Sequence, residues 1–176
     1  MTASGTLRRI GVGFMATWGA LATLFVVGEA IADPGGAAAW LLSAAWVLPM
    51  LALGWLGWRG PEPLATRVLT AAVGLVCLGW ISYVVAPGRW DDLFDRNGPI
   101  LAIAGLAATV PLGALGWRRP RTAGLLLVVA GLVPALAATL AHGGFALGRS
   151  STIATVPDLV AGGLFLLAAS LERPSP

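Results

Sequence analysis

Long apolar runs limit most strongly how this chain can fold. Six stretches of about 20 residues hold few charged side chains, and as helices each can cross a hydrocarbon core of about 30 Å. We predict spans at residues 10–31, 37–58, 64–86, 97–117, 122–141 and 153–171. Turn sequences such as "DPGG" at 33–36 separate them. The fold class expected is an all-α integral membrane protein, with residues 1–176 forming a single bundle of six transmembrane helices and no soluble domain.

Composition excludes several classes of protein and site. Only 11% of the 176 residues are charged, whereas soluble domains carry about 25%. The eleven basic residues are all arginine, so a P-loop and a Schiff-base lysine are excluded. Cys77 is the only cysteine and His142 the only histidine, which excludes an intramolecular disulfide and paired-histidine haem ligation. We expect no catalytic residue, no cofactor and no nucleic-acid partner.

The arginines indicate the orientation in the membrane. With the N-terminus inside, eight arginines fall in inner segments: Arg8, Arg9, Arg59, Arg67, Arg118, Arg119, Arg121 and Arg173. Only Arg89, Arg96 and Arg149 fall outside. This bias follows the positive-inside rule and predicts that both termini are cytoplasmic. Arginine without lysine, together with abundant Ala and Gly, indicates a GC-rich bacterial genome and hence a bacterial cytoplasmic membrane.

The N-terminus resembles a signal peptide in part. Two arginines precede an apolar stretch that ends in "AIA" at 30–32. The stretch has about 20 apolar residues, more than the usual 7–15, so we expect the first span to be retained.

Two tryptophans lie far from both predicted interfaces. Trp18 and Trp46 are close to the middle of the first and second spans, whereas membrane tryptophans are enriched at the interfaces. They either fill space between neighbouring helices or line a ligand cavity, because aromatic side chains are common in such walls.

Asp158 is a carboxylate within the last apolar segment. The sequence "TVPD" at 155–158 fits the capping pattern [ST]-x-x-[DE], which predicts a final helix that starts near residue 156 and is capped by Thr155. The alternative is a polar pocket on the outer side, because ionisable groups within a span usually pair or face a cavity. Its ligand-binding or proton-relay residues would be Glu29, His142, Arg149 and Asp158.

An aspartate motif follows the third span. "DDLFD" at 91–95 resembles the DDxxD magnesium-diphosphate motif of isoprenoid-transferring enzymes. The resemblance implies that Asp91, Asp92 and Asp95 hold Mg²⁺, whose ligands are oxygen atoms. The simpler interpretation is a short amphipathic helix on the outer membrane surface, with Trp90, Leu93 and Phe94 on its apolar face. We expect the latter, and no metal site.

Two further patterns concern internal symmetry and association. "LGWRGP" at 56–61 returns as "LGWRRP" at 115–120, which favours a weak two-helix repeat, 37–86 and 97–141. Small residues on the fourth span (Ala104, Gly105 and Ala108) permit close helix packing, against a protein partner or a second copy.

We expect a non-enzymatic accessory subunit of a membrane assembly, or a protein that binds a small apolar ligand. One alternative is a small transporter or channel-like protein with its polar site at Glu29, His142 and Asp158. The other is a magnesium-dependent enzyme that acts on a lipid diphosphate through the DDxxD motif.

Overall fold

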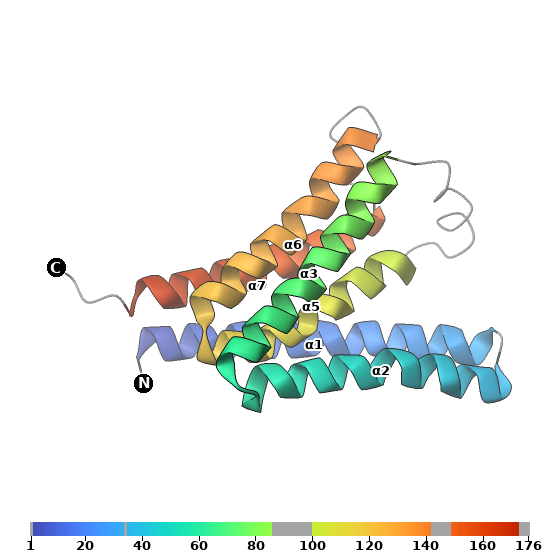
Figure 1. Cartoon of the computed structure of the whole chain (residues 1–176), viewed down its shortest axis with the longest axis horizontal. Coiled ribbons are helices and arrows are strands. Elements are labelled where there is room, and N and C mark those ends of the chain that lie inside the picture. The colour runs from blue at the N-terminus through green and yellow to red at the C-terminus, as the bar shows by residue number, and fades with distance from the viewer. Residues whose placement is uncertain (1, 34, 86–99, 142–148, 173–176) are drawn as a thin grey trace.

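The chain forms a bundle of long helices. The computed structural model describes residues 2–33, 35–85, 100–141 and 149–172, and every regular element within these ranges is a helix (Figure 1). These elements are α1 (Ala3–Ala32), α2 (Gly36–Arg59), α3 (Glu62–Val85), α5 (Ile100–Arg118), α6 (Pro120–Ala141) and α7 (Arg149–Ser170). The prediction of an all-α fold is confirmed for this part of the chain.

Several of these helices have the length and apolarity of membrane spans. Among the described residues four qualify by both criteria: Ala3–Ala32, Gly36–Arg59, Glu62–Ser82 and Pro120–Ala137. Large apolar side chains are more than two-thirds exposed on several helices, for example Leu24, Trp40, Leu75 and Leu140. Such a surface is unfavourable in water and favourable in lipid. The fold is therefore that of a membrane protein.

Helices α1, α5, α6 and α7 form the centre of the bundle. α1 packs against α5 and α7, and α6 lies along α7, while α2 and α3 cover α5 and α6. The core contains Met15, Leu69, Leu112, Leu115, Leu127 and Phe165. The start of α1 and the end of α7 lie at the same end of the bundle, and the α1–α2 hairpin extends farthest in the opposite direction (Figure 1).

Glycine permits the closest helix contacts. A Cβ atom on Gly162 of α7 would lie 3.0 Å from the carbonyl oxygen of Gly124 on α6. The Phe165 ring packs on Gly11 of α1 and on Gly116 of α5. Because a larger residue at these positions would meet backbone or ring atoms, glycine brings α1, α5, α6 and α7 together around Phe165.

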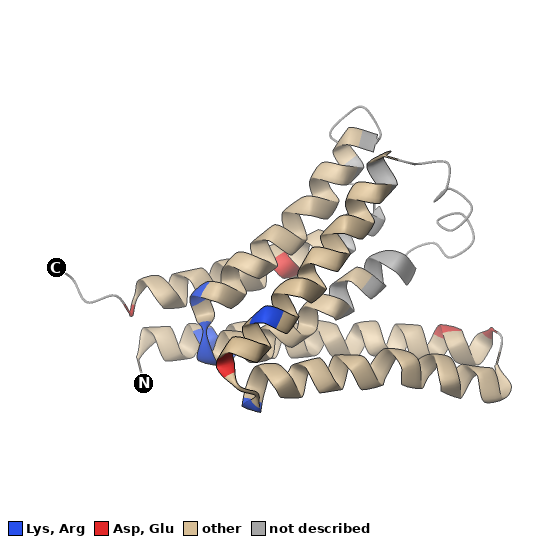
Figure 2. Ribbon diagram, in the orientation of Figure 1, with Lys and Arg blue, Asp and Glu red and all other residues tan. Residues whose placement is uncertain are grey.

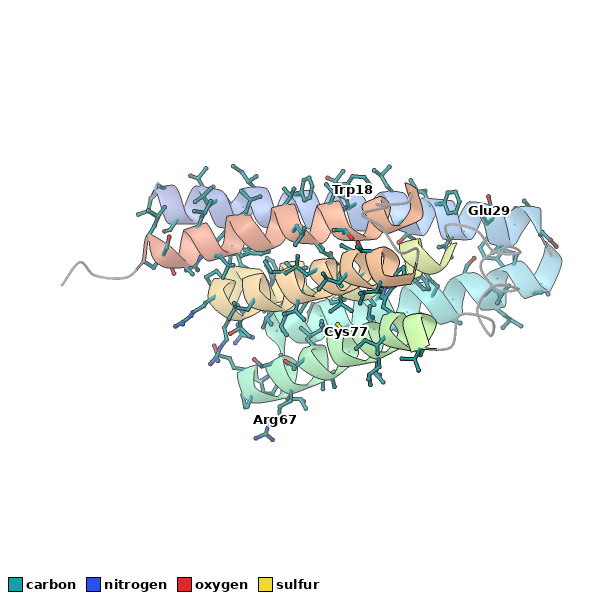
Figure 3. The ribbon with its side chains drawn as sticks, turned by 90° about the horizontal axis from the view of Figure 1, so that it is seen from above. Trp18, Glu29, Arg67 and Cys77 are labelled. Carbon is teal, nitrogen blue, oxygen red and sulfur yellow. The ribbon has the colours of Figure 1, made fainter. Side chains whose placement is uncertain are left out.

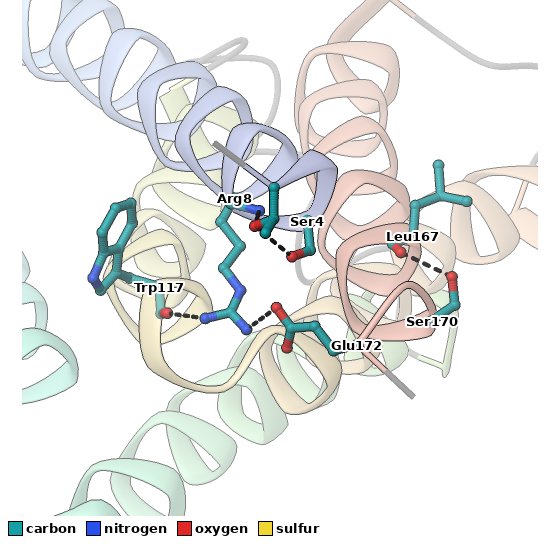
Figure 4. Close-up of polar contacts among 8 residues, drawn as sticks. Ser4, Arg8, Trp117, Leu167, Ser170 and Glu172 are labelled. Atoms are coloured by element: carbon teal, nitrogen blue, oxygen red, sulfur yellow. Dashed lines mark hydrogen bonds and ion pairs between the residues drawn. The ribbon is translucent and has the colours of Figure 1, made fainter. Parts of the chain in front are cut away.

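Ion pairs join several helix ends at one end of the bundle (Figure 2). We call this end, where α1 and α3 begin and α2, α5 and α7 end, the arginine-rich end. Arg8 pairs with Glu172 and donates a hydrogen bond to the Trp117 carbonyl oxygen at 3.1 Å (Figure 4). Glu62 pairs with Arg119 and, at 3.7 Å, with Arg118. These contacts bring the start of α1, the end of α7, the α5–α6 junction and the start of α3 to one level.

Two helices begin earlier than the apolar segments predicted. α1 begins at Ala3 rather than near residue 10, and the Thr2 hydroxyl caps it by accepting a hydrogen bond from the Gly5 amide at 3.3 Å. α7 begins at Arg149 rather than near residue 156. Both helices continue through polar residues, because hydropathy marks the segment suited to lipid and not the ends of the hydrogen-bonded helix.

Candidate functional site

Asp158 is buried where three helices meet. Its side chain, on α7, is 2% exposed and accepts a hydrogen bond from the Thr109 hydroxyl of α5 at 2.6 Å. A Cβ atom on Gly131 of α6 would lie 3.2 Å from the Asp158 Cβ. Thr109 is itself only 1% exposed. A polar pair therefore lies in the mostly apolar interior between α5, α6 and α7.

The capping interpretation of Asp158 is wrong. α7 begins at Arg149, so Asp158 lies roughly 13 Å into the helix at about 1.5 Å per residue. Pro157 is within the helix and not in its first turn. The Thr155 hydroxyl is buried and has no hydrogen-bond partner among the residues that the structure describes. The "TVPD" pattern is thus part of a continuous helix, and Asp158 bonds to another helix instead of to its own first turn.

The other residues of the predicted polar pocket are not seen beside Asp158. Gly11 of α1 packs on Phe165 of α7, and the two helices run in opposite directions, which places Asp158 near the level of Trp18. Glu29 is then roughly 16 Å farther along α1; it is exposed and lies near the far end of that helix (Figure 3). His142 and the Arg149 side chain are outside the described residues.

Trp18 and Trp46 both contact apolar neighbours. The Trp18 ring meets the Phe14 ring edge to face, with their centroids 6.3 Å apart. Trp46 packs near Ala22 in a small cluster that also includes Val26 and Met50. The Trp46 cluster joins α1 and α2, whereas the Trp18–Phe14 contact lies within α1, so the space-filling interpretation of the two rings stays a prediction.

An apolar groove of about 800 Å³ lies between α1, α2 and α5. We call it the α1–α2–α5 groove; its lining residues include Val12, Met15, Leu51, Gly54, Trp55 and Pro111. Neither Trp18 nor Trp46 belongs to the lining, and none of the lining residues is charged. Leu51 and Trp55 are more than half exposed, so the groove opens at the side of the bundle. The apolar wall has the size of a small-molecule site.

Aromatic and basic side chains surround one end of this groove. Trp58, which lines it, stacks on Trp117 with ring centroids 6.0 Å apart. The guanidinium carbon of Arg59 lies 5.9 Å from the centroid of the Trp55 ring, within the range of a cation–π interaction. The groove therefore ends in a charged aromatic rim at the arginine-rich end.

Sequence reasoning did not identify Thr109 or this groove. Thr109 is one hydroxyl in an apolar segment, and threonines in helices commonly bond to their own backbone. The groove has a weak signal in small residues of two helices, Gly54 on α2 and Gly113 and Ala114 on α5. That signal becomes specific only when the two helices are placed side by side.

The aspartates of the DDxxD motif, Asp91, Asp92 and Asp95, lie outside the described residues. Within the described ranges, no three His, Cys, Asp or Glu side chains are grouped so that they could hold a metal ion.

No protein-family model matches the chain, and neither a curated protein nor a solved structure is significantly similar to it. The proposals below therefore rest on its residues and its geometry.

Proposed function

We propose that this chain is a non-enzymatic membrane protein that binds a small apolar ligand in the α1–α2–α5 groove, as an accessory subunit of a membrane assembly. In this proposal it crosses a bacterial cytoplasmic membrane six times, with both termini in the cytoplasm. The observation that carries it is the groove itself, about 800 Å³ in volume and lined without a charged side chain.

The lining determines the kind of ligand. Small-molecule sites are mostly apolar with a few polar groups that fix the ligand's orientation. Here the wall is made of methionine, leucine, valine, alanine and tryptophan side chains. Such a wall favours hydrocarbon by dispersion and shape, and it offers no charged partner to an ionic substrate. A hydrocarbon chain satisfies this lining better than a sugar, nucleotide or ion.

Filling the groove tests the proposal. Gly54 lines the groove, and a Cβ atom there would meet nothing within 4 Å, so Gly54→Leu adds a branched apolar side chain at the groove without a clash at its Cβ. Gly74 on α3 is similarly open and does not line the groove, which makes Gly74→Leu the matched control. After purification in mild detergent, native mass spectrometry should find a bound apolar molecule on the wild type and on Gly74→Leu, and much less on Gly54→Leu. Equal retention by both variants would contradict the proposal.

A second candidate function is proton-coupled transport through Asp158. The observation that favours it is the buried carboxyl side chain between α5, α6 and α7, because ionisable residues within spans commonly mark proton or ion pathways. Proton uptake by proteoliposomes should then fall to background in Asp158→Asn. Unchanged uptake, or none above empty liposomes for the wild type, would exclude this function.

A further inference from the structure

We infer that the ligand of the α1–α2–α5 groove is an anionic phospholipid of the inner leaflet, with one acyl chain in the groove and its headgroup phosphate on Arg59. This inference rests on the proposed function and deepens it. It adds a chemical class of ligand and the side chain that selects it.

The length of the groove fits one leaflet. On α2 the lining residues run from Leu48 to Trp58, which at about 1.5 Å per residue is roughly 15 Å. The hydrocarbon core of a bilayer is about 30 Å thick, so this length is about half of it. A single acyl chain that enters from the arginine-rich end would fill the groove and end near the bilayer centre.

Arg59 is placed where the headgroup of such a lipid would lie. It is the last residue of α2, directly after Trp58, and its guanidinium group lies over the Trp55 ring. Arg59 therefore follows one lining residue, Trp58, in the sequence and covers the ring of another, Trp55. The acyl chain of a phospholipid is covalently joined to its headgroup. An acyl chain in the groove therefore places the headgroup phosphate at this rim, within reach of the Arg59 donors.

Three other arginines at this end already have acidic partners. Arg8 pairs with Glu172, and Arg118 and Arg119 pair with Glu62. Within the described part of the chain, no acidic side chain pairs with Arg59, whose guanidinium meets the Trp55 ring. Guanidinium groups bind phosphate oxygens through two parallel hydrogen bonds. Charge complementarity, together with the position of Arg59 over Trp55 of the groove lining, therefore favours a lipid phosphate at Arg59.

The net charge of the lipid should matter as well as its phosphate. Attraction between an anionic membrane surface and one Lys or Arg is worth about 1 kcal/mol, which corresponds to about a fivefold difference in affinity. We therefore expect phosphatidylglycerol to bind the wild type about five times more tightly than phosphatidylcholine with identical acyl chains. The identical chains keep the contribution of the groove constant.

Native mass spectrometry of the full chain in mild detergent, titrated with these two lipids, tests the inference. Arg59→Gln should bind both lipids equally, whereas Arg59→Lys should keep most of the preference. Arg67 on α3 is exposed and points away from the bundle (Figure 3), so Arg67→Gln is the control and should bind as the wild type does. Thermal melts in the same detergent identify a variant that fails to fold. If Arg59→Gln does, Arg59→Ala, which also removes the charge, replaces it, and a preference that persists in Arg59→Ala contradicts the inference.

The outcomes separate the two proposals. If Gly54→Leu loses both lipids but the wild type shows no headgroup preference, the groove remains and Arg59 has no selective role. If the preference persists in Arg59→Gln, or falls equally in Arg67→Gln, the headgroup site is elsewhere and the inference is wrong. If a second copy of the chain displaces lipid from the groove, both proposals are overturned.

Discussion

At the residue scale, Asp158 shows how a local pattern can mislead. Thr155, Pro157 and Asp158 together match a helix start, yet all three lie inside α7. The pattern describes only competition between a side chain and its own backbone. It contains no information about Thr109, which is distant in the sequence and donates to Asp158 from α5. A carboxylate is rare in an apolar segment, so the sequence alone marks Asp158 as a functional candidate. It does not identify Thr109 as the partner of Asp158.

The Thr109–Asp158 hydrogen bond predicts different effects for two substitutions. Asp158→Asn keeps an oxygen that accepts from Thr109, so the free energy of unfolding should change by less than about 1 kcal/mol. Asp158→Ala removes that acceptor and leaves a cavity, and should cost about 1–3 kcal/mol. Unfolding in mild detergent, with Ser170→Ala as an exposed hydroxyl control, measures the difference. If Asn damages the protein as much as Ala, the carboxyl group stabilises the fold through more than the oxygen that accepts from Thr109.

At the element scale, hydropathy located the helices well. The structure has α2 at Gly36–Arg59 and α6 at Pro120–Ala141, close to the predicted 37–58 and 122–141. The ends of α1 and α7 differ more, because a helix continues into polar sequence as long as its backbone bonds can form. The groove depends on how α1, α2 and α5 cross, which follows from packing between distant segments and has no periodic signal in the sequence.

The internal repeat also belongs to this scale and stays a prediction. Its two halves lie side by side, with α2 against α5 and α3 against α6. The tryptophans of the two similar motifs, Trp58 and Trp117, are stacked on each other. A duplicated two-helix unit would give such an arrangement, in which equivalent residues meet.

The contact between α6 and α7 predicts opposite effects for neighbouring glycines. A Cβ atom on Gly162 would lie 2.9 Å from a Val128 methyl group and 3.0 Å from the Gly124 carbonyl oxygen, whereas one on Gly163 would meet nothing within 4 Å. Gly162→Ala should therefore push the helices apart and cost about 1–3 kcal/mol. Gly163→Ala should be neutral or stabilise by up to about 1 kcal/mol, since alanine favours helix. Thermal melts compare the two, and equal melting temperatures would contradict this description of the interface.

At the scale of the whole molecule, the helix ends divide by charge. The arginine-rich end contains the start of α1 and the end of α7, the ion pairs of Glu62 and Glu172, and the rim of the groove at Arg59. The opposite end of the α1–α2 hairpin carries Glu29 and Asp33. This division agrees with the positive-inside rule, on which the proposed orientation rests. The headgroup site at Arg59 belongs to the inner leaflet only if this orientation is correct.

Labelling of single cysteines with a membrane-impermeant maleimide in intact cells tests that orientation most directly. In a Cys77→Ala background, cysteine replaces either Leu171 at the arginine-rich end or Asp33 at the opposite end; both positions are exposed. Asp33→Cys should react in intact cells, and Leu171→Cys only after the membrane is opened. Reaction of Leu171→Cys in intact cells, with Asp33→Cys protected until the membrane is opened, would reverse the orientation and contradict the account.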